Sequence, residues 1–113
     1  AYLVPIDGDV AEKLMKECPF YTEYTVPAKT YAGQKEDVKT VTVKATLIVS
    51  ASASEEDVYK LTAAIFDNID AITAENGKGA ELSIENATSG MTVPFHKGAA
   101  KYFAEKGIDV KVD

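Results

Sequence analysis

The first quarter of the chain shows strand and helix patterns in its hydrophobic positions. Residues 2–6 form a short apolar run, which predicts a strand. Apolar side chains then recur at helical spacing, and Asp9 and Glu12 are placed as a capping pair, so residues 7–18 are predicted to be a helix. Residues 20–26 alternate between two faces, which predicts a second strand.

A longer strand is predicted over residues 38–50, after a polar loop that contains Pro27 and Gly33. One face of this strand is apolar along its length, while the other carries threonine and lysine until it turns apolar at Ile48. A strand that is half polar and then apolar on both faces passes from a half-solvated setting into a covered one. We interpret it as a segment that links two environments.

Helices are predicted for the rest of the chain. Ser54 and the three acids after it predict a helix start, and an apolar stripe continues the helix until Asn76. A short helix is expected over residues 80–87 and a last one over residues 99–106, which Gly107 stops. This order predicts an α/β fold, α+β as an isolated piece, with few strands and helices packed on the sheet.

Length and charge narrow the class of protein. With 113 residues, 46% of them hydrophobic, the chain is expected to form a single domain over residues 1–113. Its net charge of −6 repels a phosphate backbone, so no nucleic-acid partner is expected. All 12 cations are lysine, so any anion site lacks the two-pronged guanidinium of arginine. No apolar run reaches the length of about 20 residues that spans a bilayer, and no direct membrane insertion is expected.

Catalytic or metal chemistry has few candidates. His96 is the only histidine and Cys18 the only cysteine, so a histidine or cysteine metal site has no second ligand of its kind. We expect His96 to bond backbone at a helix start and Cys18 to be a buried, inert thiol. The acids at residues 55–57 fit the positive end of a helix. The sequence therefore predicts no enzyme, no metal and no cofactor.

Aromatic residues gather near the central loop. Tyr21, Tyr24 and Tyr31 could form a wall for a small ligand. Alternating strand positions serve core or interface packing equally well, so both readings stay open here.

Two stretches carry a resemblance to a known family. They are TYAGQ, from Thr30 to Gln34, with Asp37 following, and PFHKGAAKYFAEKG at residues 94–107. With the segments around them, they resemble the C-terminal portion of TAXI-family solute receptors of tripartite ATP-independent periplasmic (TRAP) transporters. Ala32 and Lys97 depart from the family pattern, which often has proline there.

The resemblance implies a periplasmic or extracytoplasmic receptor with two lobes and the type II periplasmic-binding-protein fold. Such a receptor binds a small organic acid or amino acid between its lobes and delivers it to TRAP membrane permease subunits. The chain would be a C-terminal lobe portion, without the signal peptide.

On this reading the loop faces the cleft or its hinge. Lys29 would offer a point charge, Thr30 and Gln34 hydrogen bonds, and Tyr31 a ring and a hydroxyl. A loop that only turns the chain remains the alternative for these residues. A non-catalytic structural or interaction module remains the alternative function.

Overall fold

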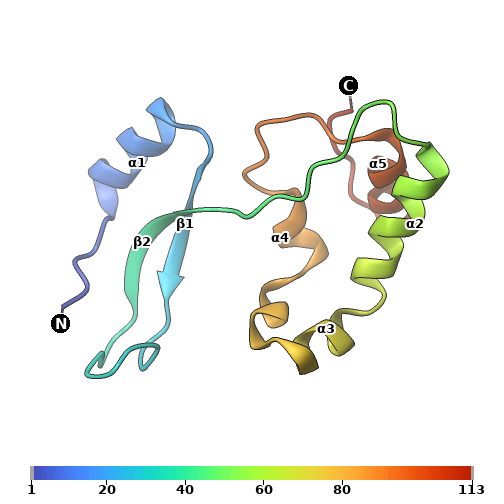
Figure 1. The fold of residues 1–113 in the computed structure, drawn as a ribbon. Helices are drawn as coiled ribbons and strands as arrows, with labels where there is room; N and C mark the ends of the chain where they lie inside the picture. Colours follow the sequence, from blue (N-terminus) through green and yellow to red (C-terminus); the bar gives the residue numbers. More distant parts are fainter. Residues whose placement is uncertain (1, 113) are drawn as a thin grey trace. The chain divides into compact units, whose positions relative to one another are not determined.

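The computed structural model of the chain describes residues 2–112. Within them it has five α-helices, one 3-10 helix and one two-stranded antiparallel sheet (Figure 1), which confirms the predicted α+β class. The chain divides into two compact units, Ala1–Thr46 and Leu47–Asp113, described here one at a time. The single domain expected over residues 1–113 stays a prediction, because two compact units can fold either together or separately.

The first unit begins with helix α1, Gly8–Glu17, close to the predicted range. Its N-cap is Asp7, whose side chain makes no capping bond, so the capping pair predicted at Asp9 and Glu12 is wrong; Asp9 lies in the first turn instead. A carboxylate there is favoured by the helix dipole without a hydrogen bond. The helix ends where the Cys18 amide donates to the Leu14 carbonyl at 2.8 Å, just before a proline that cannot continue it.

Strands β1, Tyr21–Val26, and β2, Val38–Val43, form the antiparallel sheet. Their register pairs Tyr21 with Val43 and Val26 with Val38. Both strands are rich in β-branched and aromatic residues, which suit a pleated surface. The strand predicted over residues 20–26 is confirmed.

Two strand predictions from the sequence are wrong. Residues 2–6 are not a strand, although the Ile6 amide donates to the Lys39 carbonyl at 3.1 Å beside β2. The strand predicted over residues 38–50 ends at Val43, and residues 44–50 have no regular structure. A strand needs a neighbour to complete its ladder. Within residues 2–112, the ladder between β1 and β2 ends where Tyr21 pairs with Val43, and no further strand continues it.

Helices make up most of the second unit. They are α2, Glu55–Phe66; α3, Ile69–Glu75; the 3-10 helix η1, Gly77–Glu81; α4, Ile84–Thr88; and α5, Lys97–Glu105. The Ser54 hydroxyl accepts the Asp57 amide at 3.3 Å, which confirms the predicted cap of α2.

Two helix predictions in this unit need correction. The helix predicted to run on to Asn76 is broken at residues 67–68, where the Asn68 side chain donates to the Ala64 carbonyl at 2.8 Å. That bond takes a carbonyl which a continued helix would use. The helix predicted over residues 80–87 is instead η1 followed by α4, since Ser83 begins a new helix by accepting the Asn86 amide at 3.0 Å.

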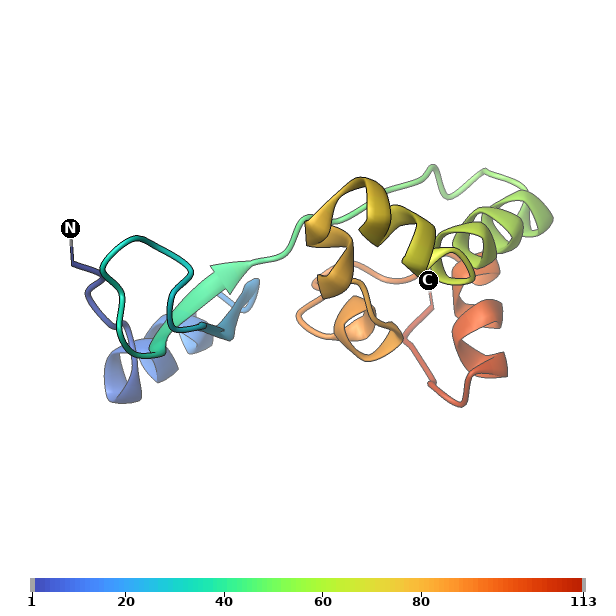
Figure 2. The same ribbon diagram turned by 90° about the horizontal axis from the view of Figure 1, so that it is seen from below.

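The core of the second unit lies between α2 and α5, which run side by side (Figures 1 and 2). Val58 is 5% exposed, and Tyr102 and Phe103 are each 3% exposed. Gly98 allows the close approach, because a Cβ at this position would lie 2.7 Å from the Tyr59 amide nitrogen. The predicted last helix is thus confirmed as the element that closes this core.

Two tyrosine hydroxyls donate hydrogen bonds to carboxylates at the edge of this core. Tyr102 donates to Asp67 Oδ1 at 2.8 Å, and Tyr59 donates to Glu105 Oε2 at 2.8 Å. Lys106 Nζ lies 3.8 Å from Asp67 Oδ1 and 5.1 Å from the centre of the Tyr102 ring. Burial, and then the bond to Asp67, raise the pKa of Tyr102 to about 12, above the ordinary 10.0.

The raised pKa of Tyr102 makes stability depend on pH at the alkaline end. Between pH 10 and about pH 12 the unfolded chain loses this proton while the folded chain keeps it, so the free energy of unfolding falls as pH rises. We expect Tyr102→Phe to make this fall less steep. Urea unfolding of both proteins from pH 9 to pH 11.5 measures the two slopes, and equal slopes would contradict the assignment to Tyr102.

Candidate functional site

The loop at residues 27–37 joins β1 to β2 and holds all four predicted ligand residues. Its ends are tied by the Ala28 amide, which donates to Asp37 Oδ1 at 2.7 Å. Further in, the Lys29 amide donates to the Gln34 carbonyl at 3.2 Å. Lys29 has φ 68°, a left-handed conformation uncommon for a side chain larger than glycine. The loop is therefore a compact surface loop whose shape is set by its own hydrogen bonds.

The Gln34 side chain organises this loop from within. Its Oε1 accepts the Tyr31 amide at 3.3 Å, while its Nε2 donates to the Val26 carbonyl at 3.2 Å and to the Glu36 carbonyl at 2.9 Å. Both amide hydrogens of Gln34 are therefore used inside the protein. Gln34 supports the loop, and its Nε2 has no hydrogen left to donate to a ligand.

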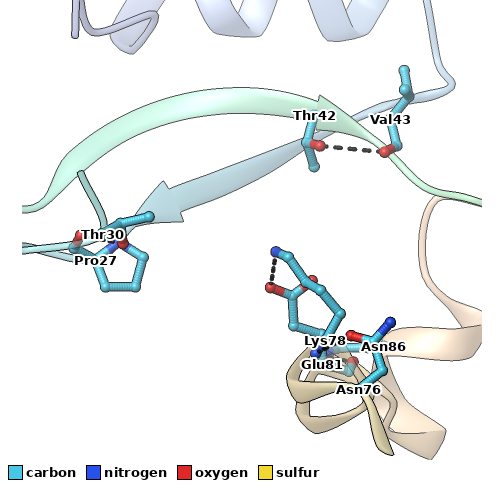
Figure 3. Close-up of polar contacts among 8 residues, drawn as sticks. All are labelled: Pro27, Thr30, Thr42, Val43, Asn76, Lys78, Glu81 and Asn86. Carbon is cyan, nitrogen blue, oxygen red and sulfur yellow. Dashed lines mark hydrogen bonds and ion pairs between the residues drawn. The ribbon is translucent and has the colours of Figure 1, made fainter. Parts of the chain in front are cut away.

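Thr30 and Tyr31 form the outer part of the loop. The Thr30 hydroxyl donates to the Pro27 carbonyl at 2.7 Å, and the two residues lie together in Figure 3. The Tyr31 carbonyl accepts the Gln34 amide at 3.1 Å, and Gly33 completes this turn with φ 86°. Tyr31 is 59% exposed. The turn thus presents the Tyr31 ring to solvent from a fixed backbone.

The loop gathers the predicted residues but gives them unequal freedom. Lys29 and Tyr31 are exposed, and the Thr30 oxygen can still accept a bond, while Gln34 is half-buried. An ammonium, a phenol and a hydroxyl oxygen on one short loop can hold a small polar molecule. The ligand role of these residues stays a prediction. Tyr21 packs against Phe20, with ring centres 4.9 Å apart, which favours packing for that tyrosine.

Gln34→Ala should loosen the loop while leaving the sheet paired. Three hydrogen bonds are lost, each worth about 1 kcal/mol. Amide hydrogen exchange at Tyr31 should therefore become at least about tenfold faster. Gln34→Glu is the matched control, because it keeps the acceptor and loses the two donor hydrogens, so we expect an intermediate exchange rate. An unchanged rate in Gln34→Ala would show that the turn keeps its shape without the hydrogen bonds of the Gln34 side chain.

The other candidate residues have structural partners. His96 caps α5, as predicted: its Nδ1 accepts the Gly98 amide at 3.1 Å, and its Nε2 lies 3.2 Å from the Ala53 carbonyl. The neutral tautomer with hydrogen on Nε2 satisfies both contacts. Cys18 is half-buried rather than buried. Among residues 2–112, no group of three His, Cys, Asp or Glu side chains could hold a metal ion.

The GKG stretch at residues 77–79 forms the start of η1 rather than a phosphate loop. Asn76 Oδ1 accepts the Lys78 amide at 3.0 Å. Lys78 Nζ pairs with Glu81 Oε1 at 2.6 Å, as Figure 3 shows. These contacts explain the stretch as a structural turn between α3 and α4.

Sequence reasoning missed a hollow in the second unit. It has a volume of about 370 Å³ and lies between the chain after α4 and the C-terminal segment at residues 109–111. The available signal was the alternation of apolar and charged residues from Ile108 to Val112, which is typical of an extended segment.

Among the residues that the structure describes, no helix has both the length and the apolar character needed to cross a membrane.

The chain is similar to a known protein family over nearly its whole length. The profile of the NMT1-like family matches residues 1–107, which is nearly the whole chain and includes both the loop and α5. The chain therefore belongs to the NMT1-like family, which relates it to periplasmic-type binding proteins and indicates a general role in solute binding.

Proposed function

We propose that the chain is the solute-binding component, or part of it, of a TRAP transporter of the TAXI type. In this role it binds a small organic acid or amino acid between two lobes, outside the cytoplasm, and passes it to the membrane permease subunits. The observation that carries the proposal is the family match over residues 1–107. The resemblance of the TYAGQ loop and of residues 94–107 to TAXI receptors supports the finer assignment.

The ligand would contact the outer part of the loop. Lys29 supplies a positive charge for a carboxylate, and the Tyr31 ring and hydroxyl supply a wall and a hydrogen bond. Gln34 acts indirectly, since its three hydrogen bonds fix where the Tyr31 backbone lies. A loop shaped in advance loses less conformational freedom when it binds, which favours affinity.

The proposed role is not catalytic. Both ring nitrogens of His96 contact backbone groups, so neither is oriented toward a reacting group. The remaining nucleophile candidate, Cys18, lies at the end of α1, where its amide closes the helix. These positions indicate that His96 and Cys18 support the fold, which agrees with a family related to binding proteins.

Tyr31→Ala tests the proposed site. We expect the dissociation constant for the best-binding compound among succinate, glutamate and related acids to rise about tenfold. This corresponds to a loss of about 1.4 kcal/mol of binding free energy. The matched control is Tyr2→Ala, because Tyr2 is 99% exposed and outside the loop. Calorimetric titration measures both variants, and equal affinity of Tyr31→Ala and the unmodified chain would remove Tyr31 from the site.

One observation favours the interaction module as a second candidate. Leu47, Ile48 and Val49 are 69%, 78% and 40% exposed, in consecutive positions. Exposed apolar runs of this kind often mark a surface that another chain covers. Sedimentation at increasing protein concentration tests it: self-association that Ile48→Ser abolishes favours a module, and a monomer at all concentrations counts against it.

A further inference from the structure

The chain passes from α3 to η1 through an asparagine followed by a glycine, Asn76 and Gly77. Asn76 is exposed and is the N-cap of η1, and its Oδ1 accepts the Lys78 amide at 3.0 Å. Gly77 is also exposed, and a Cβ at this position would meet nothing within 4 Å. Water therefore reaches this junction, and the space beside the backbone of residue 77 is open.

Asparagine is among the thermolabile residues of proteins, because the backbone nitrogen of the next residue can attack its side chain. Attack of the Gly77 nitrogen on Asn76 Cγ closes a succinimide ring. The two groups belong to neighbouring residues, so little entropy is lost when they meet. A side chain on the attacking residue would crowd the approach, and glycine has none. Gly77 is also the first residue of η1, and the first amides of a helix have no carbonyl within that helix to bond.

The hydrogen bonding of Asn76 favours the same reaction. Negative charge develops on Oδ1 when the nitrogen attacks, and Oδ1 is the atom that accepts the Lys78 amide. A backbone amide that points at a developing oxyanion lowers the barrier. Among residues 2–112, no hydrogen bond holds Nδ2 of Asn76, the group that leaves. The reacting carbonyl is therefore polarised, and the leaving group is free to depart.

The other two asparagines of the chain differ in both respects. Asn68 is followed by isoleucine and Asn86 by alanine, so a side chain crowds the attacking nitrogen in each case. Their Nδ2 groups also donate to backbone carbonyls, at 2.8 Å from Asn68 to Ala64 and at 3.4 Å from Asn86 to Glu81. Asn68 and Asn86 are therefore internal controls within the same molecule.

We propose that Asn76 and Gly77 form a modification site, at which the asparagine converts spontaneously to isoaspartate and aspartate. The Gly77 nitrogen bonds to Asn76 Cγ, the bond from Cγ to Nδ2 breaks, and Nδ2 leaves as ammonia with the proton that the Gly77 nitrogen loses. Water then opens the ring and returns a proton to that nitrogen. Its attack at Cγ gives aspartate, and its attack at the main-chain carbonyl carbon gives isoaspartate, whose backbone runs through the side chain.

Isoaspartate would loosen the contact between η1 and α3. The Gly79 amide donates to the Asn76 carbonyl at 2.7 Å. Gly79 also lies close to α3, because a Cβ there would be 2.7 Å from the Thr73 nitrogen. The extra backbone carbon of isoaspartate displaces η1 from this position. We expect amide hydrogen exchange at Gly79 to become about fivefold faster in converted chains, as for the loss of one hydrogen bond.

Storage of the full chain in mildly alkaline buffer tests the proposal. Peptide mapping by mass spectrometry, with enzymatic methylation of isoaspartate, measures conversion at each asparagine. We expect Asn76 to convert at least about tenfold faster than Asn68 and Asn86. No isoaspartate at residue 76, or equal rates at all three asparagines, would overturn the proposal.

Two variants separate the reaction from the fold. Gly77→Ala adds a side chain where the structure has room, so the turn is kept while conversion of Asn76 should slow about tenfold. Asn76→Ser keeps a capping oxygen but has no carboxamide, so its exchange at Gly79 should stay constant during storage. Equal conversion of Asn76 in Gly77→Ala and the unmodified chain would overturn the role of Gly77. Equal acceleration at Gly79 in Asn76→Ser and the unmodified chain would overturn the assignment to Asn76.

Discussion

Phe103→Ala is expected to destabilise the second unit by about 3 kcal/mol or more. Phe103 is 3% exposed, and its ring packs against Phe66, Phe95 and Tyr102 with ring centres 5.6, 5.7 and 6.0 Å apart. Alanine removes the ring that all three contact and leaves a cavity between α2 and α5. Urea unfolding followed through the amides of α2 and α5 measures the loss.

The control for this change is Leu61→Ala on α2. Leu61 is 44% exposed, so its removal takes away a side chain that water already reaches, and we expect a loss of about 1 kcal/mol or less. If both variants lost the same stability, the aromatic cluster around Phe103 would not be the centre of this unit.

Gly98→Ala is expected to destabilise the second unit by nearly as much, because the added methyl group crowds the contact between α2 and α5. A Cβ at residue 98 would overlap the Glu55 carbonyl oxygen, and it would lie 2.7 Å from the Tyr59 nitrogen and 3.0 Å from Val58 Cβ. Two of these neighbours are helix backbone, so α5 must move away from α2. Such overpacking costs about 3 kcal/mol at the upper end of its usual range. The same urea unfolding experiment measures it.

Gly77→Ala makes the same chemical change where there is room. A Cβ at residue 77 meets nothing within 4 Å, so alanine there restricts the unfolded chain and adds about 0.5 kcal/mol of stability. A small, equal effect of Gly77→Ala and Gly98→Ala would mean that α2 and α5 are not in close contact at Gly98.

Sequence patterns predicted best the elements that local chemistry determines. The start of α2 follows from Ser54 and the acids after it, because a cap and the helix dipole act within one turn. Strand β1 follows from the alternation of residue types. The helix stop at Gly107 follows from the tolerance of glycine for a left-handed backbone, and the structure gives this residue a φ of 82°. These features need no knowledge of distant parts of the chain.

Elements that depend on distant partners were predicted less well. Residues 44–50 have the composition of a strand, but a ladder forms only where a second strand lies alongside. The break between α2 and α3 depends on Asn68, whose side chain takes the Ala64 carbonyl. Pattern and propensity describe what a segment can form, while its neighbours decide what it does form.

The loop that holds Lys29, Thr30, Tyr31 and Gln34 was predicted from its polar residues between two strands, and the structure describes that loop. The ligand role of these residues comes from the resemblance and stays a prediction. The internal role of Gln34 depends on a carbonyl eight positions earlier, at Val26, and sequence alone does not predict this contact. The hollow beside residues 109–111 was missed because its walls come from separate segments joined by the bridge between Phe95 and Val112.

The most direct test of the central claim is an amide NMR titration of the full chain with small dicarboxylates and amino acids. The proposal predicts saturable shifts at residues 29–34 with at least one acid, and smaller shifts at those residues after Tyr31→Ala. Dispersed peaks with no saturable movement at residues 29–34 for any acid would contradict the proposal that this loop is the binding site.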